Sequence, residues 1–283
     1  MPLDRETRKD IQDFVRTKPR TIQEIAERIG KSWRTADRYT AKMEDQEGLI
    51  QRRTFREGTR GALKIVYWNN IDTFNSSKIQ EQLLTKIEAG RDKRDFSPFD
   101  IYQCADEDKR NAFAEQQPDE SVEGTHKLFE KLRSAQERIF VFSGNLTWAN
   151  VTHNGEEAID VFRELADDGI TIKFLGSVDI ASISNAKKLL ALNESLSEDM
   201  VSVRHAEQPL RAFIVDDKHC QFKELRHPED GSDVDTETHL FYNIHDQEWV
   251  EWTQQVFWKL YRGGIPAERR IQDLESIQNI QQL

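Results

Sequence analysis

The segment from Thr21 to Trp68, TIQEIAERIGKSWRTADRYTAKMEDQEGLIQRRTFREGTRGALKIVYW, indicates two helices joined by a tight turn and followed by two strands. Thr21 and Glu24 have capping-box spacing, in which each side chain bonds a backbone amide at a helix start. Gly30 supplies the turn, and Ser32 is a good N-cap for a second helix over residues 32–46. Two helices, a turn and two strands joined by an Arg-rich loop are the order of a winged helix-turn-helix. Duplex DNA is therefore the first candidate partner.

The second helix of this segment has two distinct faces. Ala36, Tyr39 or Thr40, and Met43 recur at helical spacing and are expected to point inward. On the outer face, arginine would suit guanine edges, and serine or threonine would suit phosphates or bases. Basic residues along the strands expected at 49–55 and 63–68 would follow the phosphate backbone, although a small helical domain with a solvated basic face would show a similar pattern. The expected DNA-binding residues are Ser32, Trp33, Arg34, Thr35, Arg38 and Lys42 in the helix, and Arg52, Arg53, Arg56, Arg60 and Lys64 in the wing.

Charge is divided unevenly along the chain. The net charge of -11 by itself disfavours binding to nucleic acid. Residues 1–70, however, carry 16 Lys and Arg against 11 Asp and Glu, whereas the remaining 213 residues carry 24 against 40. Such a division is typical of a basic DNA-binding domain joined to an acidic body, which would repel DNA and restrict binding to one face.

The composition, 37% hydrophobic and 32% charged over 283 residues, is that of a globular protein with room for two domains. No apolar run approaches the roughly 18 residues that span a bilayer, and the N-terminus lacks the apolar region of a signal peptide. Two cysteines, Cys104 and Cys220, favour a reducing, cytoplasmic setting. The histidines lack paired ligand spacing, with His219-Cys220 only a weak metal hint, and glycine-rich nucleotide motifs are absent. We therefore expect no metal, no cofactor and no membrane partner.

Four regions are expected: a winged helix-turn-helix domain (1–70), a linker helix with an irregular connector (71–118), an α/β domain (119–264) and a helical tail (265–283). In the connector, Phe96, Phe99, Ile101 and Tyr102 are too apolar for a free linker, whereas residues 106–117 are expected to be looser. Helices then alternate with strands, which predicts a mixed sheet between helices. The helices are expected at 4–16, 77–89, 122–136, 155–168, 179–192 and 247–261, and the strands at 138–143, 170–175, 201–205, 211–216, 220–225 and 239–244. The apolar residues of the tail favour packing on its own domain or on a dimer partner over a heptad coiled coil.

The segment Gln208 to Asp216, QPLRAFIVD, is similar to the phospholipase D-like motif, in which His, any residue, Lys, four residues and Asp follow one another. Asp216 matches the last position, but Arg211 stands for the Lys and Pro209 for the His. Residues 223–226, KELR, stand where the motif's Gly-Ser-x-Asn would be expected. In that family the His acts as the nucleophile toward phosphorus, a role that proline cannot perform. The resemblance therefore implies a phospholipase D-like fold without the activity.

A winged helix-turn-helix followed by an inactive phospholipase D-like domain resembles the archaeal TrmB-type transcriptional regulators. This resemblance implies a homodimer and, as in some members, a small ligand in the C-terminal domain. The residues expected to line such a pocket, at the ends of the strands, are Ser143, Gly144, Asn145, Arg211 and Asp216. The alternative is that Arg211 pairs with Asp216 and that Asn145 caps a turn.

Together these features predict a homodimeric, DNA-binding transcription regulator that is not an enzyme. It would read the major groove with helix 32–46 and sense a small-molecule effector. Two alternatives stay open. One is a phosphodiesterase or nuclease of phospholipase D type, in which His205 takes the place of the missing histidine after a register change. The other is a chromatin-like protein that coats DNA without choosing sequences.

Overall fold

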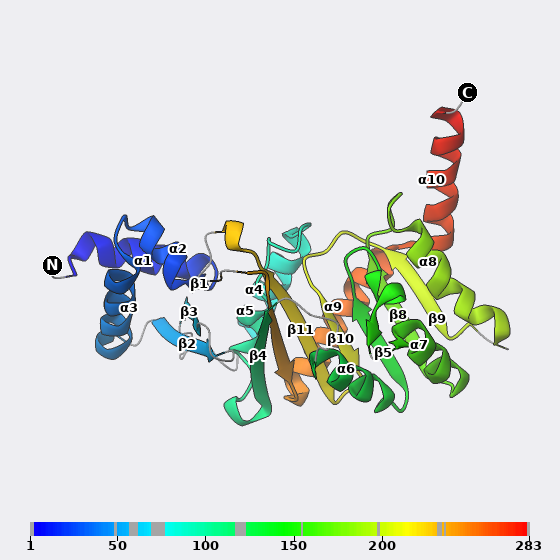
Figure 1. Cartoon of the computed structure of the whole chain (residues 1–283), viewed down its shortest axis with the longest axis horizontal. Helices are drawn as coiled ribbons and strands as arrows, with labels where there is room; N and C mark the ends of the chain where they lie inside the picture. Colours follow the sequence, from blue (N-terminus) through cyan, green and yellow to red (C-terminus); the bar gives the residue numbers. More distant parts are fainter. Residues whose placement is uncertain are drawn as a thin grey trace.

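The structure is a computed structural model that describes residues 3–47, 50–56, 62–68, 77–116, 123–153, 155–196, 199–230, 234 and 236–281. It consists of a small N-terminal domain and a larger C-terminal domain that lie side by side along the long axis (Figure 1). The expected fold class, a mixed sheet between helices preceded by a small domain, is confirmed, and the helices and strands of the small domain are compatible with the expected winged helix-turn-helix.

The N-terminal domain packs three helices on a three-stranded sheet of order β1-β3-β2. Thr21 and Glu24 form the predicted capping box, with amide-to-side-chain hydrogen bonds of 3.1 and 2.7 Å. Gly30 has a φ of 62°, a left-handed conformation that favours glycine at the turn. The predicted inward set of the second helix is buried together with Ile11, Ile22 and Ile25. The elements are α1 (Arg5–Thr17), β1 (Arg20–Thr21), α2 (Ile22–Arg28), α3 (Trp33–Glu47), β2 (Ile50–Arg56) and β3 (Ala62–Trp68).

An eight-stranded mixed sheet of order β13-β9-β8-β5-β10-β11-β12-β4 forms the centre of the C-terminal domain. The strands β5, β8 and β9 run parallel, and the remaining pairs are antiparallel. The strands of the middle are short apolar runs buried on both faces, as the sequence predicts. They are β4 (Arg110–Gln116), β5 (Arg138–Phe142), β8 (Thr171–Gly176), β9 (Val201–His205), β10 (Ala212–Val215), β11 (His219–Arg226), β12 (Thr238–Ile244) and β13 (Ile265–Pro266), and a separate pair is formed by β6 (Thr152–His153) and β7 (Glu156–Glu157).

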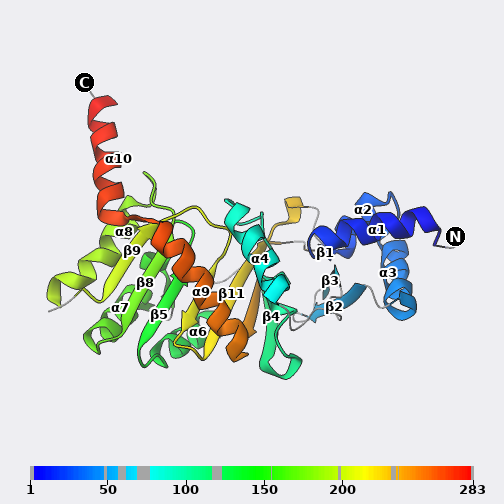
Figure 2. The ribbon, with the colours of Figure 1, turned by 180° about the vertical axis from the view of Figure 1, so that it is seen from behind.

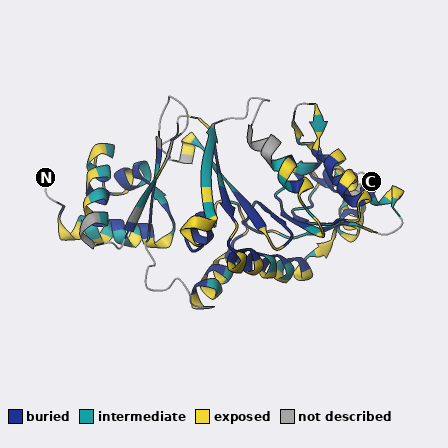
Figure 3. Ribbon diagram, turned by 90° about the horizontal axis from the view of Figure 1, so that it is seen from below, coloured by how far each residue is buried: buried dark blue, intermediate teal, exposed yellow. Residues whose placement is uncertain are grey.

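Helices cover both faces of this sheet, and the two faces bury separate apolar clusters. One face is covered by α4 and α9, which lie in front of the sheet in Figure 2. The other is covered by α6, α7, α8 and the base of α10. The strands are buried between helices whose outer sides are exposed (Figure 3). The helices are α4 (Ser77–Ala89), α5 (Phe99–Tyr102), α6 (Glu123–Arg133), α7 (Ala158–Asp167), α8 (Ile183–Leu190), α9 (Gln247–Gly263) and α10 (Ala267–Gln281).

One expectation about the connector is wrong. Residues 110–116 are not loose but form β4, which pairs with β12 from Arg110–Ile244 to Gln116–Thr238. The segment RNAFAEQ has little strand propensity, so its conformation comes from the exposed edge of β12 rather than from its own side chains. The expectation that Phe96 and Phe99 do not belong to a free linker is confirmed, since both are buried against the same face as α9. The described part of the connector thus belongs to the C-terminal domain.

The two domains share an apolar interface through β3. On one side of this strand, Val66 packs among the N-terminal helices. On the other side, Leu63, Ile65 and Tyr67 belong to the main apolar cluster of the C-terminal domain. The Tyr67 ring lies 4.6 Å from that of Phe99 on α5, measured between centroids. Because side chains alternate between the two faces of β3, this strand contributes to the apolar cores of both domains.

Ion pairs add to this interface. Arg226, at the end of β11, is 10% exposed and lies 2.8 Å from the Glu224 carboxylate on its own strand. It also lies 3.9 Å from Glu24, the capping residue of α2 in the other domain. Glu224 accepts a further hydrogen bond from the Tyr242 hydroxyl at 2.8 Å. Arg226 thus links α2 of the N-terminal domain to the central sheet.

The tail helix α10 starts on the C-terminal domain and then projects away from it (Figure 1). Its first residues, Ala267 and Ile271, are buried, whereas Ile277 is 52% exposed. Across the described residues, no helix combines the length and the apolar character that crossing a membrane requires.

Candidate functional site

The outer side of α3 presents a stripe of basic side chains. Arg34, Arg38 and Lys42 are all exposed, and their spacing of four residues places them on one side of the helix. Lys31, in the turn before the helix, is exposed as well and extends the basic stripe. The Ser32 hydroxyl accepts a hydrogen bond from the Thr35 amide at 3.3 Å, which fixes the start of the helix. We call these four cations the α3 stripe.

The described wing cations face inward or toward the other domain. Arg52 lies 3.4 Å from Asp37 and from Glu44 of α3, and Lys64 lies 2.9 Å from Asp37. Lys64 also stands 5.0 Å above the ring of Trp33, which is half-buried against the N-terminal core. These contacts bind the wing sheet to α3, so the expected phosphate contacts of Arg52 and Lys64 compete with ion pairs inside the domain.

Arg53 is directed to the opposite side of the wing sheet. Its guanidinium lies 5.2 Å from the ring of Tyr102 in the C-terminal domain. Period-2 alternation explains this, because Arg52 and Arg53 must point to opposite faces of β2. Arg60 and the side chain of Arg56 lie outside the described residues.

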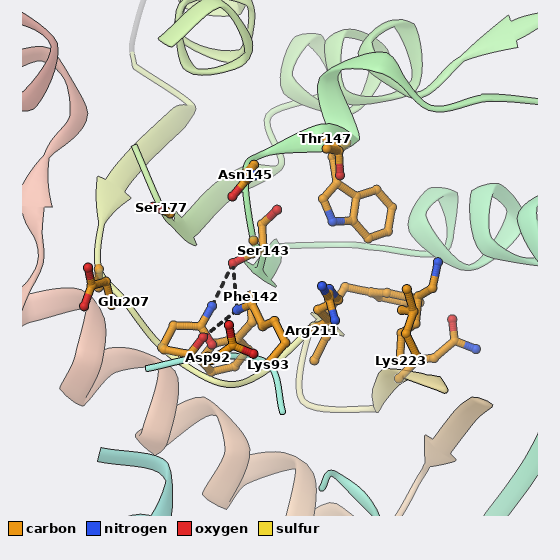
Figure 4. Close-up of a pocket in the computed structure, with 18 of the residues that line it drawn as sticks. Asp92, Lys93, Phe142, Ser143, Asn145, Thr147, Ser177, Glu207, Arg211 and Lys223 are labelled. Carbon is orange, nitrogen blue, oxygen red and sulfur yellow. Dashed lines mark hydrogen bonds between the residues drawn. The ribbon is translucent and has the colours of Figure 1, made fainter. Parts of the chain in front are cut away.

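A cavity of about 750 Å³ opens in the C-terminal domain where β5 ends and β10 begins. Four of the five expected pocket residues, Ser143, Gly144, Asn145 and Arg211, line it. Figure 4 shows Arg211 and Lys223 side by side, with Ser143, Asn145 and Thr147 on the neighbouring wall. Aromatic side chains complete the walls, so the cavity combines cations, hydroxyl and amide groups, and apolar surface. The remaining polar or aromatic wall residues include Asp92, Lys93, Phe142, Trp148, Ser177, Glu207, Gln208, Phe213, Gln221 and Phe241.

Asp216 is not part of this cavity, so the expectation for this residue is wrong. Its carboxylate lies at the opposite end of β10 and accepts hydrogen bonds from the amides of Gln136, Glu137 and Arg138, each at 3.0 Å. Asp216 itself has a φ of 48°, in the tight turn between β10 and β11. It therefore anchors the loop that enters β5. The alternative pairing with Arg211 is excluded by the same geometry.

An Asp216→Ala substitution is expected to lower the free energy of unfolding by about 2–4 kcal/mol. It removes the acceptor for three amides and places alanine in a left-handed conformation. Denaturant unfolding followed by circular dichroism measures the loss. Asp216→Asn keeps one oxygen acceptor and tolerates the same φ, so it should lose less. Equal stability of Asp216→Ala and the parent chain would contradict the anchoring role.

Lys93 closes the floor of the cavity. Its ammonium donates to the carbonyl oxygens of Ser143, Gln208 and Leu210 at 3.1, 2.6 and 2.7 Å. Burial and then the charge of Arg211 lower the pKa of Lys93 to about 7. The three carbonyl oxygens accept hydrogen bonds from the three hydrogens of the charged ammonium. These bonds favour the charged form and so oppose the lowering of the Lys93 pKa. The residue ties the end of β5 to the start of β10.

The described residues that line the cavity include no histidine and no cysteine. Pro209, at the position of the motif's nucleophile, packs against Gly90, where an added Cβ would lie 2.8 Å from its ring. His205 lies outside the cavity, and its Nδ1 accepts a hydrogen bond from the Val178 amide at 3.0 Å. The described walls therefore offer no side chain of the kind that attacks phosphorus in the phospholipase D-like motif.

The adjacent residues His219 and Cys220 do not share a ligand site. His219 Nε2 lies 3.2 Å from the Asn243 amide oxygen, and burial lowers the pKa of His219 to about 3. Cys220 points to the other face of β11, into the apolar cluster beneath α9. Burial raises the pKa of its thiol. Strand alternation thus separates the two side chains.

Comparisons with known proteins give structural likeness only. No family model and no curated protein matches the chain. TrmBL2, described as an archaeal chromatin protein with a novel mode of DNA binding, is 14% identical over 92% of this chain and 93% of its own, with a TM-score of 0.41. Nuc of Salmonella typhimurium, described as a phospholipase D family member, is 11% identical over 56% of this chain and 97% of its own, with a TM-score of 0.39. NucT of Helicobacter pylori is 14% identical over 56% and 99%, with a TM-score of 0.39.

Sequence reasoning missed several residues of both sites. Lys31 could have been predicted as a DNA-contacting residue, because it directly precedes Ser32 at the start of the helix. Lys93 and Trp148 come from segments far from the 208–216 motif, and only the packing of the sheet brings them to it. Lys223 was noted only as a departure from that motif. It stands opposite Arg211 because the two strands are adjacent, the Lys223 amide donating to the Arg211 carbonyl at 2.8 Å.

Proposed function

We propose that the chain is a DNA-binding transcription regulator that contacts the major groove with α3. The observation that carries the proposal is the α3 stripe, an exposed row of cations on the second helix of a helix-turn-helix. Arginine reads guanine through two parallel hydrogen bonds, and lysine neutralises phosphate, so Arg34 and Arg38 are assigned to bases and Lys31 and Lys42 to the backbone. The acidic remainder of the chain would keep DNA on this side.

The role proposed for the wing is narrower than the sequence predicts. Arg52 and Lys64 hold the wing sheet against α3 through Asp37, and their substitution would act by moving that helix. Direct contact with the DNA backbone is assigned to Arg56 and Arg60, as the sequence predicts. Ser32, Thr35 and Trp33 support the helix start and its packing beside the groove.

We propose further that the C-terminal domain senses a ligand and does not cleave DNA. The lack of a histidine among the described cavity walls supports this. Plasmid incubated with the purified chain, with and without EDTA, is expected to stay intact. Cleavage without metal that His205→Ala abolishes would instead favour a phospholipase D-type nuclease.

A homodimer completes the proposal, with α10 as one candidate contact. The exposed Ile277 on a projecting helix supports this assignment. Sedimentation equilibrium is expected to give twice the chain mass of 33.1 kDa. A monomeric mass at all concentrations up to those used for DNA binding would contradict the proposed homodimer.

Selection of bound fragments from random duplex DNA tests the function as a whole. A regulator of this kind is expected to enrich one sequence, and a dimer should enrich two symmetric half-sites. Recovery of all sequences in proportion to the input would contradict sequence-specific regulation and favour a protein that coats DNA.

A further inference from the structure

Two cations lie next to each other on one wall of the C-terminal cavity, and no carboxylate of the described residues lies within 4.0 Å of either. Arg211 directly precedes β10, and its carbonyl accepts a hydrogen bond from the Lys223 amide on β11 at 2.8 Å; both side chains are half-buried. Among the described residues neither forms an ion pair within 4.0 Å, although Asp92 and Glu237 exert weaker attraction on Arg211 from further away. The Lys223 ammonium lies 5.7 Å from the ring of Phe241. The pair faces the cavity, as Figure 4 shows.

Like charges directly opposite on adjacent strands destabilise a sheet. Burial lowers the pKa of Lys223 and the neighbouring Arg211 lowers it further, whereas the more distant Glu237 and Glu115 raise it. Some other half-buried or buried cations have close carboxylate partners, such as Arg226 with Glu224 and Lys64 with Asp37. The Arg211–Lys223 pair is therefore a site where a bound dianion would relieve repulsion that the free chain carries.

We propose that this cavity binds a phosphorylated small molecule, with the phosphate held between Arg211 and Lys223. A guanidinium presents a planar pair of donors that matches a phosphate edge, and an ammonium beside it supplies a second charge. The volume of about 750 Å³ exceeds that of a phosphate and is within the range of cavities that hold molecules up to nucleotide size.

The rest of the cavity offers contacts for the body of such a ligand. The Trp148 ring lines the cavity and supplies an apolar surface. Ser143, Asn145 and Thr147 supply hydroxyl and amide groups (Figure 4). Lys93 is already bonded to three carbonyl oxygens and is assigned to the framework rather than to the ligand. This inference rests on the sensing role proposed above. Its test uses no DNA, so a failure here would leave the DNA-binding proposal standing.

Thermal unfolding of the full chain tests the proposal at fixed ionic strength with four probes: inorganic phosphate, glycerol 3-phosphate, AMP and adenosine. A ligand at about 100 times its Kd is expected to raise Tm by about 5 °C or more. We expect this rise with at least one phosphate ester, and we expect none with adenosine, which has the body of AMP but no phosphate. No rise with any phosphate probe at millimolar concentration, or an equal rise with adenosine, would overturn the proposal.

Substitutions at the pair locate the site. Arg211→Met and Lys223→Met are each expected to weaken binding of the active probe about 10–100-fold, because each removes a charge-assisted hydrogen bond. Lys78→Met, on the exposed side of α4, makes the same charge change outside the cavity and should bind as the parent chain does. Weakening of the same size in Lys78→Met would show general anion attraction and overturn the assignment.

The ligand-free variants provide a second readout. Since Lys223→Met removes one of two repelling charges, its Tm without ligand is expected to equal or exceed that of the parent chain. A folded, more stable variant that has lost the response to phosphate is the signature of a binding site rather than of a structural ion pair. A Lys223→Met variant that melts well below the parent chain would contradict the argument from repulsion.

Discussion

Replacing Arg34 and Arg38 together by alanine is expected to weaken binding to the selected duplex by at least about 30-fold, from a loss of about 1–3 kcal/mol for each base contact. The preference for the selected sequence over random duplex should fall as well, because the affected contacts are assigned to base edges. Both side chains are exposed on α3, so the fold should be unaffected. Fluorescence anisotropy with labelled duplexes measures both quantities.

The matched control for this variant is Arg163→Ala with Arg94→Ala. These arginines are also exposed, and their loss changes the net charge equally, but they belong to α7 and to the segment before α5 in the C-terminal domain. The control should bind the selected duplex nearly as the parent chain does. Equal affinities of the α3 variant and the control would show that α3 does not read bases.

Arg226→Met is expected to lower the free energy of unfolding by about 3 kcal/mol, or Tm by roughly 6–12 °C. The substitution leaves the carboxylate of Glu224, itself 10% exposed, without its cation at 2.8 Å. It also removes the 3.9 Å contact with Glu24 across the domain interface. A buried charge that has lost its partner costs more than the pair contributes. Thermal unfolding by circular dichroism measures the change.

A second substitution distinguishes this cause from loss of packing. In Arg226→Met with Glu224→Gln, the orphaned charge is gone and the hydrogen bond from Tyr242 can persist. The double variant should recover a large part of the lost stability, as expected for two groups that interact directly. If it were less stable than Arg226→Met alone, the ion pair would not be the cause.

The local part of the fold could be predicted because its signals are local. The Thr21–Glu24 capping box, the left-handed Gly30 and the inward face of α3 each depend on residues within one or two helical turns. The buried strands followed from short apolar runs bounded by turn residues. By contrast, β4 takes its conformation from pairing with β12, about 130 residues further along the chain. Nothing in the sequence RNAFAEQ itself indicates this pairing.

The positions of candidate site residues were predicted where a local pattern decides them, as along α3 and at the facing ends of β5 and β10. The α3 stripe follows from helical spacing within a single helix. The contacts of the wing cations could not be predicted in this way, because they depend on residues from other elements. Asp37 of α3 lies against Lys64, and Tyr102 of α5 lies against Arg53. Asp216 was assigned to the cavity because it belongs to the same motif as Arg211, but a strand of four residues places the two at opposite ends. Closeness in sequence to Arg211 therefore gave the wrong position for Asp216.

The most direct test of the account is the binding of the purified full chain to duplex DNA as ionic strength is raised. We expect measurable affinity at about 50 mM salt and a fall of an order of magnitude or more by about 200 mM, since basic side chains displace counterions from phosphates. The slope against salt should decrease by about one unit in Lys42→Ala. Absence of binding to any duplex at low salt would contradict the central claim that α3 is a DNA-reading helix.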